Sequence, residues 1–93
     1  MRIIGYVEHP TLKITVFKMD NKLSVKFENP LYEQTYKFRD SEQLSTLAEV
    51  QQLVDEVFIN QVLAQLAAMH RTSQAALGRY LPAEEEEDFE EII

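Results

Sequence analysis

From Leu44 to Leu77 the chain contains neither glycine nor proline, and its apolar residues recur at helical spacing. A single helix of that length would extend about 50 Å at 1.5 Å per residue. Strands of about six to eight residues, by contrast, span only about 20–27 Å at 3.3 Å each. One short sheet therefore cannot cover the whole helix. We expect the helical region either to break or to pack its distal half on another subunit.

Capping residues predict where this helical region begins, breaks and ends. Asp40 can cap the free N–H groups of a first turn, and Gln43, three residues later, can complete a capping box. A new helix can start near Asn60 or at Thr72-Ser73, where side chains suited to the N-cap are available. Gly78 suits the C-terminal cap. The region is therefore predicted to run from about residue 41 to 78 and, if it breaks, to break at one of those two places.

The middle of the helical region, from Val57 to Met69, is apolar nearly all round, which indicates burial on more than one side. A chain of 93 residues also has only a marginal core of its own. We therefore expect a homodimer formed through the helices. The predicted interface residues are Phe58, Val62, Leu66 and Met69.

Before the helical region, apolar and polar residues alternate with the period of two that is typical of half-buried strands. The segments 12–19 and 23–28 are separated by Asp20-Asn21, whose side chains tolerate the left-handed backbone of a tight turn. These segments are predicted to form an antiparallel hairpin. Two further strands, at 3–8 and 32–39, are separated from it by the turns at His9-Pro10 and Asn29-Pro30. The four strands form a predicted meander.

One face of this sheet is expected to form the core together with the first part of the helical region. Its predicted strand residues are Leu12, Ile14, Val16, Leu23, Val25, Phe27, Tyr36 and Phe38. The helical residues expected to pack on them are Leu44, Leu47, Val54 and Phe58.

The opposite face of the sheet combines basic residues with an aromatic side chain. Basic groups beside an exposed aromatic ring are typical of surfaces that bind single-stranded nucleic acids, although lysine also makes a sheet face soluble. Four antiparallel strands followed by a helix also resemble the architecture of single-strand-binding PUR repeats, without their sequence motifs. The residues of this possible nucleic-acid face are Lys13, Phe17, Lys26, Lys37 and Arg39.

The net charge of −7 is unevenly distributed, because residues 1–40 carry a net charge of +2 and residues 41–93 a net charge of −9. Residues 83–93, which we call the acidic tail, contain seven acids and few apolar side chains. Such a segment is expected to be disordered until it meets a basic partner. Its partner-binding residues are predicted to be Asp88, Phe89, Ile92 and Ile93, of which the last three can form one apolar face if the tail becomes helical. The stretch 88–92 is similar to the acidic aromatic segment with which hirudin binds a basic surface.

Residue types that carry chemistry are scarce, so we expect no enzyme. The chain has no cysteine and two glycines, and its two histidines stand in no metal-binding motif. Its serines lack the setting of a catalytic nucleophile. We therefore expect no cofactor and no metal. With no signal sequence and no membrane span in view, the expected location is the cytoplasm, without membrane association.

Taken together, these patterns predict an α+β fold: a four-stranded antiparallel meander, a long and possibly broken C-terminal helical region, and a disordered acidic tail. The expected domain covers residues 1–82, and the tail covers 83–93. The predicted function is that of a small interaction module that self-associates through its helices, with a tail that docks on a basic protein. The alternative is a nucleic-acid-binding or regulatory protein that uses the basic sheet face, with the tail as a competitor.

Overall fold

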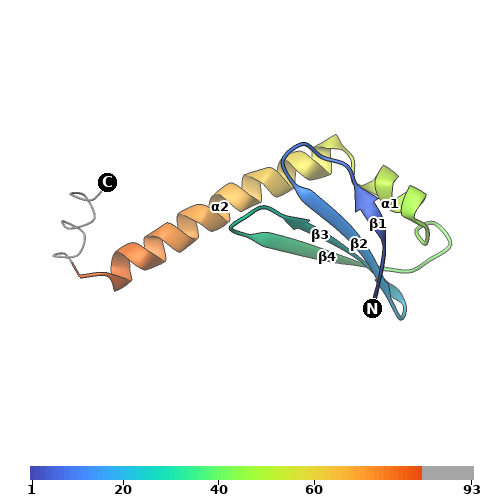
Figure 1. Ribbon diagram of the computed structural model, residues 1–93, viewed down its shortest axis with the longest axis horizontal. Coiled ribbons are helices and arrows are strands. Elements are labelled where there is room, and N and C mark those ends of the chain that lie inside the picture. The colour runs from blue at the N-terminus through green and yellow to red at the C-terminus, as the bar shows by residue number, and fades with distance from the viewer. Residues whose placement is uncertain (83–93) are drawn as a thin grey trace.

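The computed structural model, which describes residues 1–82, is a two-layer α+β fold (Figure 1). Four antiparallel strands in the order β1-β2-β3-β4 form the sheet. The elements are β1 (Arg2–Val7), β2 (Lys13–Met19), β3 (Lys22–Glu28), β4 (Glu33–Arg39), α1 (Leu47–Leu53) and α2 (Glu56–Tyr80). The fold class and the meander predicted from the sequence are thus confirmed for this part of the chain, and the acidic tail lies outside it.

Short polar turns fix the register of the meander. Asp20, in the turn between β2 and β3, has a φ of +55°, the left-handed conformation that asparagine and aspartate tolerate best. In the next turn the Asn29 side chain accepts hydrogen bonds from the backbone N–H groups of Leu31 and Tyr32. Between β1 and β2, His9 accepts through Nδ1 from the backbone N–H group of Leu12 at 3.1 Å. This histidine therefore stabilises a turn.

Strand β1 contains a bulge that the period-two pattern does not reveal. Its register on β2 shifts between Ile3, which pairs with Phe17, and Gly5, which pairs with Val16. Gly5 has a φ of +157° and lies so close to the Leu47 side chain of α1 that an added Cβ atom would overlap with Leu47 Cδ2. A glycine is therefore required at this position both for its backbone conformation and for the close approach of α1.

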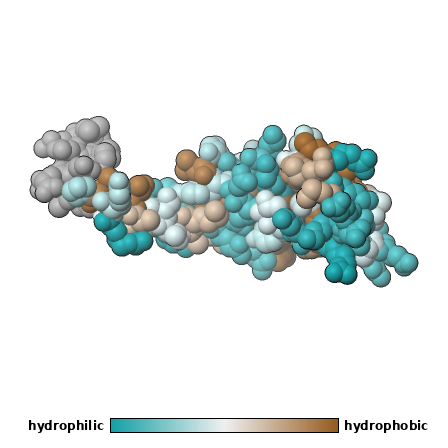
Figure 2. Space-filling model, turned by 90° about the horizontal axis from the view of Figure 1, so that it is seen from below, coloured by the Kyte–Doolittle hydropathy of each residue, from teal (hydrophilic) through white to brown (hydrophobic). Residues whose placement is uncertain are grey.

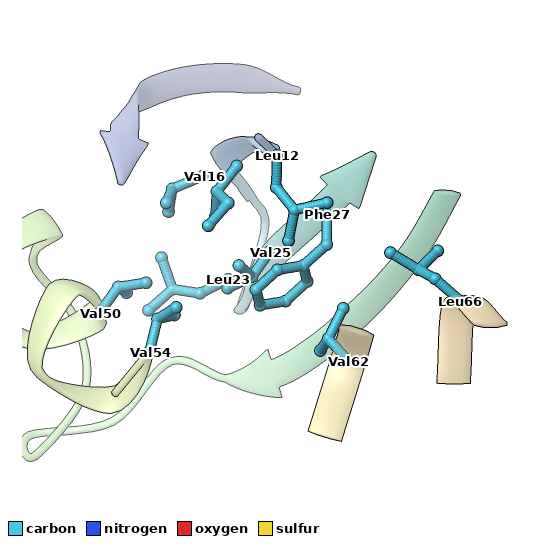
Figure 3. Packing of buried hydrophobic residues seen from close by; sticks show 10 residues of the cluster. Leu12, Val16, Leu23, Val25, Phe27, Val50, Val54, Val62 and Leu66 are labelled. Atoms are coloured by element: carbon cyan, nitrogen blue, oxygen red, sulfur yellow. The ribbon is translucent and has the colours of Figure 1, made fainter. Parts of the chain in front are cut away.

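Both helices lie on the same face of the sheet and form one core with it (Figure 3). Every predicted strand residue of the core points to this face: six are buried, and Tyr36 and Phe38 pack partly buried beside them. The buried core consists of Leu12, Ile14, Val16, Leu23, Val25, Phe27, Val50, Val54, Val62 and Leu66. Leu47 of α1 and Phe58 of α2 pack against this core, as predicted, and Leu44 also packs there, from the segment before α1.

The start of the helical region differs from the predicted capping box at Asp40 and Gln43. Helix α1 begins later, with Thr46 as its N-cap and Glu49 completing the box through its side chain. Asp40 instead pairs with Lys18, Nζ to Oδ2 at 3.3 Å. A hydrogen bond from Ser45 and the neighbouring Lys18 charge hold the pKa of Asp40 below its usual value. Asp40 therefore joins the end of β4 to β2 rather than starting a helix.

The break in the helical region also lies elsewhere than predicted. Neither Asn60 nor Thr72-Ser73 interrupts α2; the chain breaks at Val54 and Asp55, where Asp55 caps α2 by accepting from the N–H group of Phe58 at 2.9 Å. The bend allows Val54 at the end of α1 and Val62 in α2 to contact the same sheet face (Figure 3). Several residues of this region could cap a second helix. Packing on the short sheet therefore decides where α1 ends and α2 begins.

Helix α2 is longer than the sheet that it covers. Its 25 residues span about 37 Å, and Figure 1 shows its C-terminal half extending beyond the strands. Gly78 lies within this half and is not the C-cap; Leu81 is, followed by Pro82. The radius of gyration of 17.8 Å reflects this shape, since a compact chain of this length has about 12 Å. Met69 and His70, at the start of this half, still contact Gln34 and Tyr32. The part of α2 that projects beyond the sheet is therefore the segment after Ser73.

The cap of α1 provides a first testable prediction. Thr46→Ala is expected to lower the free energy of unfolding by about 1 kcal/mol, since it leaves the N–H group of Glu49 without its acceptor. Backbone hydrogen bonds from Ser45 and Thr46 hold the pKa of Glu49 below its ordinary value of 4.5. The stabilisation by this carboxylate is therefore complete above pH 4.5 and is lost as the pH falls through the lowered pKa.

Urea unfolding of the wild type, Thr46→Ala and Glu49→Gln over a range of pH measures both effects. Glu49→Gln should weaken the acid dependence of stability, because glutamine cannot lose or gain this proton. Glu42→Gln is the matched control: Glu42 is exposed, and within residues 1–82 it makes no side-chain hydrogen bond or ion pair. The prediction is wrong if both glutamine variants show the same acid dependence as the wild type.

Candidate functional site

The candidate site is the open face of the sheet, on the side opposite the two helices. Within residues 1–82 no helix covers this face, because α1 and α2 both pack on the other one. The strand register brings together on it side chains that are far apart in the sequence. We define the open face by its outward residues: Ile3, Tyr6, Lys13, Thr15, Phe17, Met19, Lys22, Ser24, Lys26, Glu28, Glu33, Thr35, Lys37 and Arg39.

Positive charge collects on the open face although the chain as a whole is acidic. The face carries five basic side chains and two acidic ones, a net charge of +3, whereas the whole chain has a net charge of −7. Lys26 pairs with Glu28, Nζ to Oε1 at 3.6 Å. Among the residues that the structure describes, the other four bases of the face, Lys13, Lys22, Lys37 and Arg39, form no ion pair. These four charges are therefore available to an anionic ligand.

Two adjoining hollows lie where the open face meets the turn between β2 and β3. The larger, with a volume of about 570 Å³, is lined by Asn21, Lys22, Lys37, Phe38, Arg39 and Asp40. The smaller, of about 220 Å³, shares Asn21, Lys22 and Lys37 with it. The one acid in the larger hollow, Asp40, is already paired with Lys18. The larger hollow therefore presents a net positive surface to a phosphate-sized anion.

Apolar and aromatic side chains occupy the β1 and β2 half of the same face. Ile3, Tyr6 and Met19 are each about half exposed, at 50%, 51% and 46%. Phe17 lies across from Ile3. The Lys26 ammonium group is 5.6 Å from the centre of the Phe17 ring. Planar side chains on this half of the sheet thus lie beside the free charges of β3 and β4.

All five residues predicted for a nucleic-acid face, Lys13, Phe17, Lys26, Lys37 and Arg39, lie on the open face. Sequence reasoning did not find Ile3 and Tyr6, which belong to the same surface. In a regular strand, residues 3 and 6 would point to opposite faces. The β1 bulge between Ile3 and Gly5 turns both side chains outward. The glycine in an alternating strand was the one signal that indicated such a bulge.

The predicted interface residues are placed differently. Val62 is fully buried and Leu66 is 4% exposed, both against the chain's own sheet. Phe58 and Met69 pack partly buried against the same core, and the Phe58 ring lies 5.1 Å from that of Phe27. These four residues therefore present little surface to a second copy. The tail residues predicted to bind a partner, Asp88, Phe89, Ile92 and Ile93, lie outside the described residues.

Within residues 1–82, no three His, Cys, Asp or Glu side chains lie close enough together to hold a metal ion. Over the same residues, neither helix has the length and apolar character needed to cross a membrane. Comparisons with models of protein families, with curated proteins and with solved structures found no match for this chain.

Proposed function

We propose that the open face binds single-stranded nucleic acid. The observation that carries this proposal is the distribution of charge on the fold: four unpaired bases, the half-exposed Tyr6 and the partly buried Phe17 share one uncovered face of a protein whose net charge is −7. Single-strand-binding surfaces combine these two components, a positive track for the backbone and rings on which bases stack. This function requires no catalytic group.

The two halves of the face suggest how a strand would lie. Lys22, Lys37 and Arg39 around the larger hollow would bind phosphates, while Tyr6 and Phe17 would contact bases. Neighbouring strands are about 4.8 Å apart, so β4 and β2 are separated by about 10 Å. The path from Lys37 and Arg39 on β4 thus crosses one strand to reach Phe17 on β2 and two strands to reach Tyr6 on β1. A duplex keeps its base faces stacked inside the helix, so this arrangement favours a single strand.

Fluorescence anisotropy with a labelled single-stranded oligonucleotide tests the proposal. The double variant Lys22→Glu and Lys37→Glu is expected to bind at least about tenfold more weakly, since each lost phosphate contact removes counterion release. Tyr6→Ala is expected to lose about 1–3 kcal/mol of stacking, roughly 5- to 150-fold in affinity. With four phosphate contacts, the logarithm of the affinity should fall against the logarithm of the salt concentration with a slope of about −3.

Arg71→Glu is the matched control for charge, because Arg71 is exposed on α2, away from the open face. It should bind as the wild type does. The proposal fails if the wild type does not bind at low salt, or if Arg71→Glu weakens binding as much as the double variant on the open face.

Self-association through α2 remains a second candidate function, supported by the projecting half of that helix. Leu77 is 46% exposed and Tyr80 82% exposed there, and Figure 2 shows hydrophobic side chains along this arm, beyond the largely hydrophilic body. Leu63 is also 37% exposed. Leu63, Leu77 and Tyr80 would then form the contact between two copies, in place of the four buried or partly buried residues predicted for it. A dimer would agree with the function predicted from the sequence, that of an interaction module that self-associates through its helices. A basic protein partner for the tail and a cytoplasmic location remain predictions.

A further inference from the structure

The charge of this chain is divided between two parts. Residues 1–82 contain nine basic and nine acidic residues and have no net charge, so the seven acids of the acidic tail account for the whole net charge of −7. The open face within the neutral part carries a net charge of +3. No acid occurs between Val57 and Pro82. The α2 helix therefore joins a strongly negative segment to a domain whose positive charge lies mainly on one face.

We propose that the acidic tail binds the open face and competes there with nucleic acid. This inference rests on the proposed function only in naming nucleic acid as the competitor. The contact between the acidic tail and the open face does not depend on it. The four unpaired bases of the face would bind the tail carboxylates. Phe89, Ile92 and Ile93 of the tail match the exposed Ile3 and Tyr6 in apolar character. The basic side chains and the apolar side chains of the open face thus each have a complementary group in the tail.

The length of the tail is sufficient for this contact within one chain. Thr72 and Ser73 of α2 border a hollow with Tyr32, the residue before β4. From Ser73 to Pro82 the helix carries the chain about 14 Å beyond the sheet. The eleven tail residues, when extended, span up to about 36–40 Å. The return of 14 Å and a passage of about 10 Å around the layer leave more than 10 Å, so the last three or four residues of the tail can reach the end of the face that carries Lys13. Lys22 and Arg39 lie at the opposite end of the strands, about 20 Å further, where only the tail of a second copy could bind them.

A single spin label tests the contact in the full chain without any nucleic acid. Because the chain has no cysteine, Glu87→Cys provides one unique attachment site. The nitroxide is expected to broaden the amide signals of Thr15, Lys26 and Lys37 on the open face and to leave that of Val50 in α1 unchanged. Equal broadening at the face and at Val50, or none at either, would overturn the proposal.

Mixing experiments show which copy supplies the tail. Labelled ¹⁵N protein is mixed with spin-labelled ¹⁴N protein, and broadening on the ¹⁵N chain then reports a tail from a second copy. Broadening that persists on dilution of the singly labelled protein indicates the chain's own tail. Either result supports docking of the tail on the face.

A charge-neutral tail provides the second variant. Glutamine at the other six acids of the tail, with the label kept at Glu87→Cys in the full chain, should remove the broadening and shift the amide signals of Lys26 and Lys37. If the tail occupies the face in about 90% of molecules, this change raises oligonucleotide affinity about tenfold. Unchanged amide signals on the face would overturn the tail contact even if the protein binds oligonucleotides. Changed signals without any oligonucleotide binding would overturn the proposed function and leave the contact intact.

Discussion

Replacing Phe27 with alanine is expected to lower the free energy of unfolding by about 3–5 kcal/mol. Phe27 is fully buried in β3. The centre of its ring lies 5.1 Å from that of Phe58 on α2 and 5.8 Å from that of Tyr36 on β4. Truncation therefore leaves a cavity where the sheet meets α2 (Figure 3). Urea unfolding followed by circular dichroism measures the loss.

Phe17→Ala is the matched control for this prediction. Phe17 lies on the neighbouring strand but on the open face, where it is only partly buried. Its truncation removes the contact with Lys26 and some apolar surface, and should cost about 1 kcal/mol or less. A register shifted by one residue would exchange the two faces of the sheet and so reverse the order of the two losses. A larger loss for Phe17→Ala than for Phe27→Ala would thus show that the helices cover the other face.

Leu66→Asp is expected to unfold the chain, because it places an unpaired carboxylate in the contact between α2 and the sheet. Leu66 is 4% exposed in a single copy, and burying a charge without a partner costs several kcal/mol. On sequence grounds alone, this residue was assigned to a contact between subunits. Its burial within one chain means that the substitution tests folding first. Loss of the far-ultraviolet circular dichroism signal at 25 °C is the expected result.

Leu63→Asp, one helical turn away, is the matched variant that tests assembly. Leu63 is 37% exposed, so the aspartate can remain in water and the fold should persist. If copies associate through the exposed side of α2, light scattering will show the wild type as a dimer and Leu63→Asp as a monomer. A folded Leu66→Asp variant would contradict the packing of α2 on its own sheet. A monomeric wild type at micromolar concentrations would exclude the second candidate function.

The distribution of exposure along α2 shows what the apolar pattern leaves open about its surfaces. Apolar residues occur nearly all round the helix between Val57 and Met69, and such a pattern shows that burial occurs without showing which surface causes it. Val62 and Leu66 face the sheet, whereas Val57 and Leu63 do not. The choice among these faces depends on where the preceding bend directs the helix axis.

The sequence by itself determined the strands, the hairpin at Asp20 and the two faces of the sheet. These features follow from local chemistry: alternation places successive side chains on opposite faces, and few residue types tolerate the left-handed turn that Asp20 adopts. The basic residues of the candidate site were found for the same reason, since Lys13, Lys26 and Lys37 lie in regular strands.

Only the tertiary structure decided the bulge in β1, the cap of α1 and the break before α2. Several residues of the helical region have side chains that can cap a helix, and their local energies differ by less than the packing energy of a helix on a sheet. The break falls at Asp55 because both helices must then cover one short sheet. Likewise, Tyr6 joins the open face because the bulge between Ile3 and Gly5 shifts the register of β1 on β2. Such choices depend on contacts between distant segments, which no local pattern records.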